Sequence, residues 1–130
     1  MVANSHKSMY DDTRTYIYNK AFYEALLAEP KYNNEELFDL IRQWAKDRGL
    51  YEQGDVKTQL IKLYEETGEL SRSTLKNDQE GVIDAIGDSI VVLTNLAELN
   101  GVSIETCMQS AYDEISNRTG RMLNGTFVKD

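Results

Sequence analysis

Two aspartates interrupt a long apolar run, and this pattern restricts the folds open to the chain more than any other feature. Asp84 and Asp88 lie among the Ile, Val and Leu residues of positions 82–97, and with Asn95 they project on one face of a predicted helix. Buried carboxylates destabilise a fold unless something neutralises them. The other faces of this helix are apolar, which predicts burial against a second subunit as well as against its own chain.

Three glutamates precede this run on another predicted helix, over Val56–Leu75. They are Glu65, Glu66 and Glu69, and because residues three apart are neighbours on a helix, Glu66 and Glu69 can act together. Two acidic helix segments that face each other form an oxygen-rich cage suited to Mg²⁺ or Mn²⁺. Gly68 weakens the helix by about 1 kcal/mol relative to Ala. It therefore either permits the close approach of another helix or is tolerated sequence drift.

Capping residues and apolar stripes set the bounds of the other predicted helices. One helix begins at Asn33 or Asn34, where Asn33 and Glu36 have capping-box spacing, and it stops at Gly49. The LYEQGD stretch that follows is predicted as a loop, with Asp55 as the cap of the next helix. The remaining helices are predicted over residues 12–28, from Asp78 to Asn100–Gly101, and after Ser103.

The pattern changes after Gly120 from helical to alternating. Apolar pairs flank Asn124-Gly125, a dipeptide typical of a tight hairpin turn. An isolated hairpin is marginal in water, so we expect this one to pack on the helices or on another subunit. The sequence therefore predicts an all-α helical bundle with a short C-terminal hairpin, preceded by a partly helical N-terminal extension over residues 1–32.

The net charge of −8 argues against binding to a nucleic acid polymer, because its phosphates would be repelled. A site for a single nucleotide is compatible with this charge, since a bound cation reverses the local field. No apolar run reaches the roughly 20 residues that span a membrane, and the N-terminal segment has no apolar signal region. We expect a soluble cytoplasmic protein without membrane contact. The single cysteine, Cys107, excludes an internal disulfide, and we expect it to be buried.

Two acidic motifs carry a resemblance to a known family. The first is ExxE, Glu66 to Glu69 within KLYEETGEL, and the second is IDAIGDSIVVLTNLAELNG, with Asp88 as its final aspartate. Together with the QWAKDRGL stretch and the EISNRTGRMLNGTFVKD tail, they cover about residues 35–130. In this region the chain resembles the MazG-like all-α nucleoside triphosphate pyrophosphohydrolases, most closely the short single-domain proteins often found in phages. The resemblance assigns residues 33–130 to such a domain.

The chain departs from the family pattern at one position, where Ala85 replaces the glutamate of ExxD. Asp84 lies four residues from Asp88 on the same helical face, so we interpret it as the replacement carboxylate. The resemblance implies that Glu66, Glu69, Asp88 and Asp84 bind Mg²⁺, with Mn²⁺ as an alternative. It also implies hydrolysis of a (d)NTP to the (d)NMP and pyrophosphate, in control of the nucleotide pool.

Glu65 and Lys62 are the candidate catalytic residues. Glu65 either orients or deprotonates the attacking water, or it is a surface charge. Lys62 lies one turn before Glu66 and either contacts a phosphate or pairs with Glu66.

Five residues are candidates for substrate binding. Trp44 either stacks on the base or packs in the core. Asn95 needs a hydrogen-bond partner, from a neighbouring side chain or the substrate. The resemblance implies that Tyr112, Arg118 and Arg121 contact phosphates, sometimes from a neighbouring subunit. A solvated helix end is the alternative for these three.

Three functions remain open from the sequence. The first is the Mg²⁺-dependent hydrolase, and the second is a non-catalytic nucleotide- or metal-binding helical module, which Ala85 favours. The third is an acidic helical protein that binds a host partner, and the placement of Asp84 and Asp88 among apolar residues argues against it. We expect a homodimer or a homotetramer, located in the host cytoplasm if a phage encodes the chain.

Overall fold

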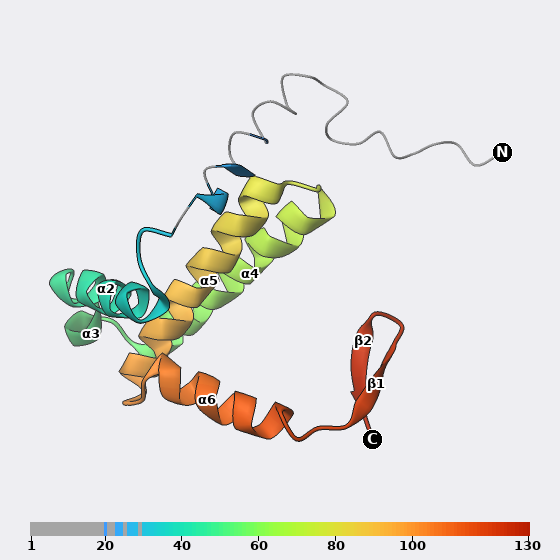
Figure 1. The fold of residues 1–130 in the computed structure, drawn as a ribbon. Coiled ribbons are helices and arrows are strands. Elements are labelled where there is room, and N and C mark those ends of the chain that lie inside the picture. Colours follow the sequence, from blue (N-terminus) through green and yellow to red (C-terminus); the bar gives the residue numbers. More distant parts are fainter. Residues whose placement is uncertain (1–19, 21–22, 25, 29) are drawn as a thin grey trace.

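The computed structural model describes residues 20, 23–24, 26–28 and 30–130. Its helices are α2 (Asn34–Asp47), α3 (Leu50–Gln53), α4 (Val56–Leu75), α5 (Gln79–Leu99) and α6 (Ile104–Ile115), and its strands are β1 (Gly120–Leu123) and β2 (Thr126–Lys129). Figure 1 shows α4 and α5 side by side as a long helical hairpin. Because α2, α3, α4 and α6 all contact α5, the helix that holds the two aspartates is the centre of the fold.

The helices begin at the caps that the sequence predicts. The Asn33 side chain accepts a hydrogen bond from the Glu36 backbone N–H at 2.8 Å, and Glu36 accepts one in return from Asn33 at 3.2 Å. Asp55, Asp78 and Ser103 cap α4, α5 and α6 in the same way. Each cap satisfies a backbone donor that the first turn of a helix leaves without a partner. The prediction of an all-α fold with a short C-terminal hairpin is confirmed.

The predicted LYEQGD loop is wrong, because its first four residues form the one-turn helix α3. Gly49, with φ of 72°, lets the chain reverse between α2 and α3. Gly54 ends the turn, and a side chain at this position would overlap the carbonyl oxygen of Leu50. The two glycines thereby place Leu50 and Tyr51 next to α5.

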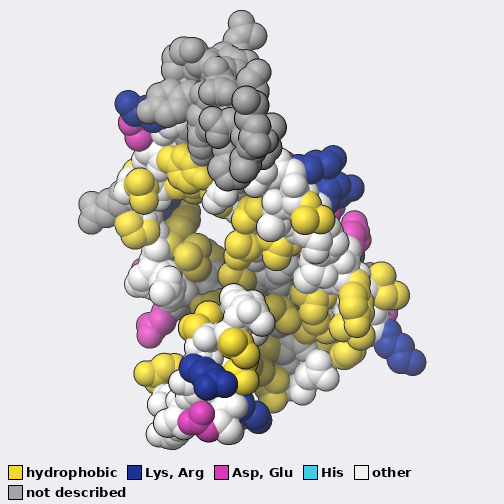
Figure 2. Space-filling model, turned by 90° about the vertical axis from the view of Figure 1, so that its right-hand side faces the viewer, with side chains coloured by type: hydrophobic (Ala, Val, Ile, Leu, Met, Phe, Trp, Pro, Cys, Tyr) yellow, Lys and Arg dark blue, Asp and Glu magenta, His cyan; other side chains and the backbone are white. Residues whose placement is uncertain are grey.

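The fully covered core of the described chain is small. Its buried apolar residues are Ala45 on α2 and Ala85, Val92 and Ala97 on α5. By contrast, Ile86, Ile90 and Leu93 of α5 are each 40–46% exposed. Figure 2 shows one face of the molecule, turned by 90° from Figure 1, with apolar side chains spread over its surface. Within one chain these apolar side chains of α5 are therefore left partly uncovered, and their burial against a second subunit stays a prediction.

One further expectation about a single residue is wrong, and one of two open alternatives for another is excluded within the chain. Cys107 is exposed, because α6 diverges from the bundle and its burial ends at Glu105. Gly68 has open space where a side chain would lie, so it does not mark a close approach of another helix within the chain.

Arg42 joins three helices near the base of α6. Its guanidinium donates two hydrogen bonds to Glu105 on α6, at 3.0 and 2.8 Å, and one to Asp39 at 2.7 Å. It also lies 3.9 Å from a carboxylate oxygen of Glu98 on α5. This network fixes where α6 leaves the bundle.

The C-terminal hairpin forms with the predicted turn. β1 and β2 pair antiparallel from Gly120 opposite Lys129 to Leu123 opposite Thr126. Asn124 and Gly125 have φ of 49° and 83°, as a two-residue turn that matches the strand twist requires. Figure 1 shows the hairpin beyond the end of α6, away from α2 to α5. Among the described helices the hairpin borders only the end of α6, where Phe127 and Tyr112 line one hollow, so its packing on another subunit stays a prediction.

The helix predicted over residues 12–28 falls mainly outside the described residues. Those described between positions 20 and 27 are helical, and Lys20 and Glu24 form an ion pair at 3.8 Å. Within the described part of the chain, no helix combines the length and apolarity needed to cross a bilayer.

Candidate functional site

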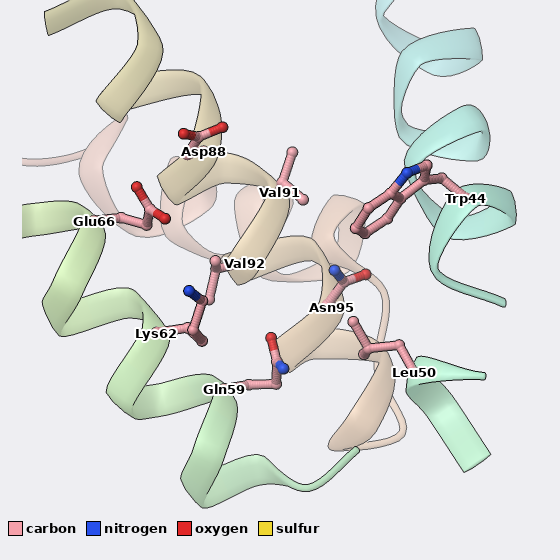
Figure 3. Close-up of a pocket in the computed structure, with 9 residues that line it drawn as sticks. All are labelled: Trp44, Leu50, Gln59, Lys62, Glu66, Asp88, Val91, Val92 and Asn95. Carbon is pink, nitrogen blue, oxygen red and sulfur yellow. The ribbon is translucent and has the colours of Figure 1, made fainter. Parts of the chain in front are cut away.

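A pocket of about 280 Å³ lies where α2, α3, α4 and α5 meet, and we call it the acidic pocket. Figure 3 shows Glu66 and Asp88 at one end and Trp44 and Leu50 at the other. The lining residues are Trp44, Leu50, Gln59, Lys62, Glu66, Asp88, Val91, Val92 and Asn95. The pocket thus has a charged end and an apolar end.

Glu66 dominates the electrostatics of the charged end. Its Oε2 is buried and accepts no hydrogen bond from the described residues. Burial raises the pKa of Glu66, and the negative charges of Asp88 and Glu69 raise it further, although Lys62 opposes them. A bound cation stabilises such a carboxylate, because its charge offsets both the burial and the repulsion by the neighbouring carboxylates.

Lys62 reaches the pocket but pairs with a different glutamate from the one considered in the sequence. Its Nζ lies 3.1 Å from Oε2 of Glu65, one turn away, and this hydrogen bond is the main cause of its raised pKa. Lys62 is therefore a cation at neutral pH, and the alternative of a pair with Glu66 is not observed. Glu65 is exposed and does not line the pocket.

Trp44 forms the wall of the apolar end. The guanidinium of Arg48, one turn later, lies 4.5 Å from the ring centroid. The Trp44 side chain is 45% exposed, so the alternative of core packing is wrong. The indole is left with an open face beside Leu50 and Val91.

Asn95 lies at the centre of the pocket lining and is 2% exposed. The Tyr51 hydroxyl donates a hydrogen bond to its Oδ1 at 2.7 Å. Burial raises the pKa of Tyr51, and the negative charge of Glu98 adds to the rise against Arg42, so the hydroxyl keeps its proton. The hydrogen-bond partner expected for Asn95 is therefore Tyr51, on α3.

Two of the four predicted metal ligands face the pocket. Glu69 and Asp84 lie one turn from Glu66 and Asp88 but are exposed and do not line it. The described residues hold no group of three or more Asp, Glu, His or Cys side chains placed to bind one ion. At the position of the departure, Ala85 is 1% exposed and packs in the core.

The candidate residues near the C-terminus lie elsewhere in this chain. Tyr112 and Arg118 line a separate hollow with Phe127, and Arg118 forms an ion pair with Glu114. Arg121 is on β1. This chain does not bring the three residues to its own acidic pocket, and their contribution from a neighbouring subunit stays a prediction.

Four residues of the pocket lining are absent from the sequence-based set: Leu50, Gln59, Val91 and Val92. Gln59, Lys62 and Glu66 follow helical spacing on α4, so the periodicity pointed to Gln59. Leu50 and Tyr51 depend on α3, which the sequence pattern did not reveal.

The fold is all-α, and carboxylates from the α4–α5 helical hairpin face a pocket. These two features together indicate the class of the molecule. The chain belongs to the MazG nucleotide pyrophosphohydrolase domain family, whose model matches residues 54–122. A relative is an uncharacterised 18.2 kDa protein from the rep-hol intergenic region of Haemophilus phage HP1 (strain HP1c1), 43% identical over 68 residues. The match covers 52% of this chain and 42% of that protein, so this chain spans less than half of its relative's length. No solved structure matches the chain.

Proposed function

We propose that this protein hydrolyses a nucleoside or deoxynucleoside triphosphate to the monophosphate and pyrophosphate, in control of the nucleotide pool. Membership of the family supports nucleotide pyrophosphohydrolysis in general. The observation that carries the proposal is the polarity of the acidic pocket, with carboxylates at one end and an open tryptophan face at the other. A nucleotide has the same polarity, because it joins a flat base to a chain of phosphates.

Mg²⁺ fits the charged end, and Mn²⁺ suits the same oxygen donors. Glu66 supplies a buried carboxylate oxygen without a hydrogen-bond partner among the described residues, and Asp88 faces it. Mg²⁺ is commonly held by one or two carboxylates together with substrate phosphates and water. When bound, it neutralises charge on the phosphate oxygens. Glu69 and Asp84, one turn away, are the further ligands in this proposal.

The other residues position the substrate. The Lys62 ammonium donates one of its three N–H groups to Glu65 and offers the other two to a phosphate. Glu65, which lies outside the pocket lining of the single chain, orients or deprotonates the attacking water in this proposal. Trp44 stacks on the base, and Asn95 binds the edge of the base. Tyr112, Arg118 and Arg121 contact phosphates from a neighbouring subunit.

The first experiment measures pyrophosphate release from a panel of NTPs and dNTPs with Mg²⁺, Mn²⁺ or EDTA. We expect metal-dependent release with a monophosphate product. Glu66→Gln and Asp88→Asn should each lower the rate by at least about a hundredfold, because they remove charge that holds the metal and phosphates. Glu35→Gln, an exposed glutamate on α2, serves as the control and should keep wild-type activity. Full activity in Glu66→Gln and Asp88→Asn would exclude this site.

A second candidate function is a nucleotide-binding module without turnover. Ala85 favours it, because the glutamate of the family pattern is absent and its position is buried. Metal-dependent nucleotide binding with no release of pyrophosphate over hours would support this function instead.

We also propose that a second copy of the chain covers the apolar side of α5. The groove lined by Leu37, Ile90 and Met108 is one part of this side. A second groove shares Trp44, Asp88 and Val91 with the acidic pocket, so the apolar surface continues into the site. A homodimer or homotetramer built on this side would cover exposed apolar area and enclose the pocket.

A further inference from the structure

We propose that Tyr51 is a positioning residue that makes Asn95 a hydrogen-bond donor to the base, so that the site prefers bases with a carbonyl group to bases with an amino group. This inference rests on the proposed nucleotide site. It adds a discrimination between uracil and cytosine, and between hypoxanthine and adenine. Tyr51 and Trp44 precede residues 54–122, the segment that the family model matches, whereas Asn95 lies within it.

The Tyr51–Asn95 hydrogen bond fixes the orientation of the amide. The hydroxyl donates to Oδ1 at 2.7 Å, and it has no other acceptor among the residues that the structure describes. If the amide turned over, the Tyr51 hydroxyl would lose its acceptor in a partly buried place. An unsatisfied buried donor destabilises the structure, so the observed orientation is held.

The amide NH₂ of Asn95 is consequently the group left for a ligand. No described residue accepts a hydrogen bond from it, and Asn95 lines the pocket together with Trp44. Figure 3 shows the amide close to Leu50 and below the Trp44 ring. A base stacked on Trp44 therefore presents its edge to a donor.

A donor at this place discriminates by chemistry. A carbonyl oxygen on the base edge accepts the hydrogen bond, whereas an amino group at the same position places two donors against each other. Uracil and cytosine differ in this way at one ring position, and hypoxanthine and adenine at another. The same hydrogen bond therefore ranks both pairs in the same direction.

The test uses tryptophan fluorescence of the full chain, because Trp44 is its only tryptophan and lies in the pocket. The protein is titrated with the 5′-monophosphates of inosine, adenosine, uridine and cytidine. We expect each carbonyl base to bind about three- to tenfold more tightly than its amino counterpart, as one neutral hydrogen bond provides. Pyrophosphate release from the matching triphosphates is measured in parallel.

Tyr51→Phe should bring both binding ratios close to one, since it frees the amide to turn over. In turnover we expect KM to rise for the carbonyl bases while kcat changes less than about twofold. Asn95→Asp keeps an acceptor for Tyr51 but replaces the NH₂ with an oxygen, so it should invert the preference. Tyr64→Phe is the matched control, because Tyr64 is 71% exposed on α4, and it should keep the wild-type ratios.

Unchanged ratios in Tyr51→Phe, or a wild-type protein whose fluorescence responds to no nucleotide, overturn the inference. If Tyr51→Phe does not fold, Asn95→Asp is the deciding variant. A base preference that does not invert in Asn95→Asp also overturns the inference. Base selectivity without pyrophosphate release contradicts the proposed hydrolysis but supports the role of Tyr51. Pyrophosphate release together with base ratios that Tyr51→Phe leaves unchanged supports the proposed hydrolysis and contradicts the role of Tyr51.

Discussion

Glu66 combines two properties that rarely persist without a functional reason. One of its oxygens is buried without a hydrogen bond from the described residues, and two neighbouring carboxylates repel its charge. A raised pKa means that the folded state disfavours the ionised form. The ionised form of Glu66 is therefore less favoured in the folded chain than in the unfolded chain, and its charge lowers stability until a cation is bound.

Glu66→Gln should therefore have opposite effects in the absence and presence of metal. Without metal, the variant should melt at a higher temperature than the wild type, because the repulsion is gone. With excess Mg²⁺, the wild type should gain several degrees and the variant should gain little, since a ligand that binds the folded state stabilises it. Thermal unfolding with EDTA and with Mg²⁺ measures both. Equal metal-induced shifts in the two proteins would place the cation elsewhere.

Glu105 makes the stability of the fold decrease as the pH falls, which is the usual direction for a carboxylate in an ion pair. Its hydrogen bonds from Arg42 lower its pKa below the usual 4.5. The stabilisation is therefore complete above pH 4.5 and is lost as the pH falls through the lowered pKa. We expect Glu105→Gln to lose less stability than the wild type as the pH is reduced from about 5 to 3. The difference is under about 1 kcal/mol, because water screens a partly exposed pair. Parallel acid unfolding curves would contradict this role.

At the scale of elements, local signals were sufficient for four helices and the hairpin. Caps such as Asp55 and Ser103 act within one turn, and the Asn124-Gly125 turn acts within two residues, so the sequence displays them directly. The one-turn helix α3 has no periodicity to detect. Its existence depends on Gly49 and Gly54 and on packing against α5, which is tertiary information.

Gly54→Ala tests whether α3 shapes the pocket. A methyl group at this position overlaps the Leu50 carbonyl, so the backbone must shift, and we expect a loss of about 1–3 kcal/mol in stability. The Trp44 fluorescence response to nucleotide should weaken as well. Gly68→Ala is the control, because its side chain meets open space and the helix gains about 0.5–1 kcal/mol. A wild-type response in Gly54→Ala would show that α3 tolerates the change.

The two ends of the site differ in how far the sequence reveals them. Glu66 and Asp88 were predicted because carboxylates at helical spacing within apolar segments are rare. Trp44 and Asn95 were identified with alternatives; the structure excludes core packing for Trp44 and provides Tyr51 as a partner of Asn95. Tyr51 was missed, since its contact with Asn95 joins residues 44 positions apart and no local pattern records such a pair.

For the whole molecule, the small covered core makes a second copy the central prediction. Several large apolar side chains of α5 and α6 are exposed in the single chain, and among the described helices the hairpin borders α6 alone, at the hollow lined by Phe127. A two-stranded hairpin is marginal in isolation. Packing of the hairpin in an assembly therefore stays a prediction.

Ile90→Lys should convert the assembly to monomers, because it places a charge on the apolar side of α5. Sedimentation at micromolar concentration measures the change, and pyrophosphate release should fall with it if the assembly encloses the site. Leu75→Lys is the control, since Leu75 is 84% exposed at the far end of α4 and should leave the assembly intact. A wild-type protein that sediments as a monomer would rule out the proposed assembly.

The position of Arg42 gives α6 the properties of a lever. The ion pair with Glu105 holds the first turn of α6, and the hairpin lies beyond its last turn. With 12 residues, α6 is about 18 Å long, so a tilt of about 10° at its base moves the far end by about 3 Å. Any change at this ion pair that tilted α6 would therefore displace the hairpin more than the first turn of the helix.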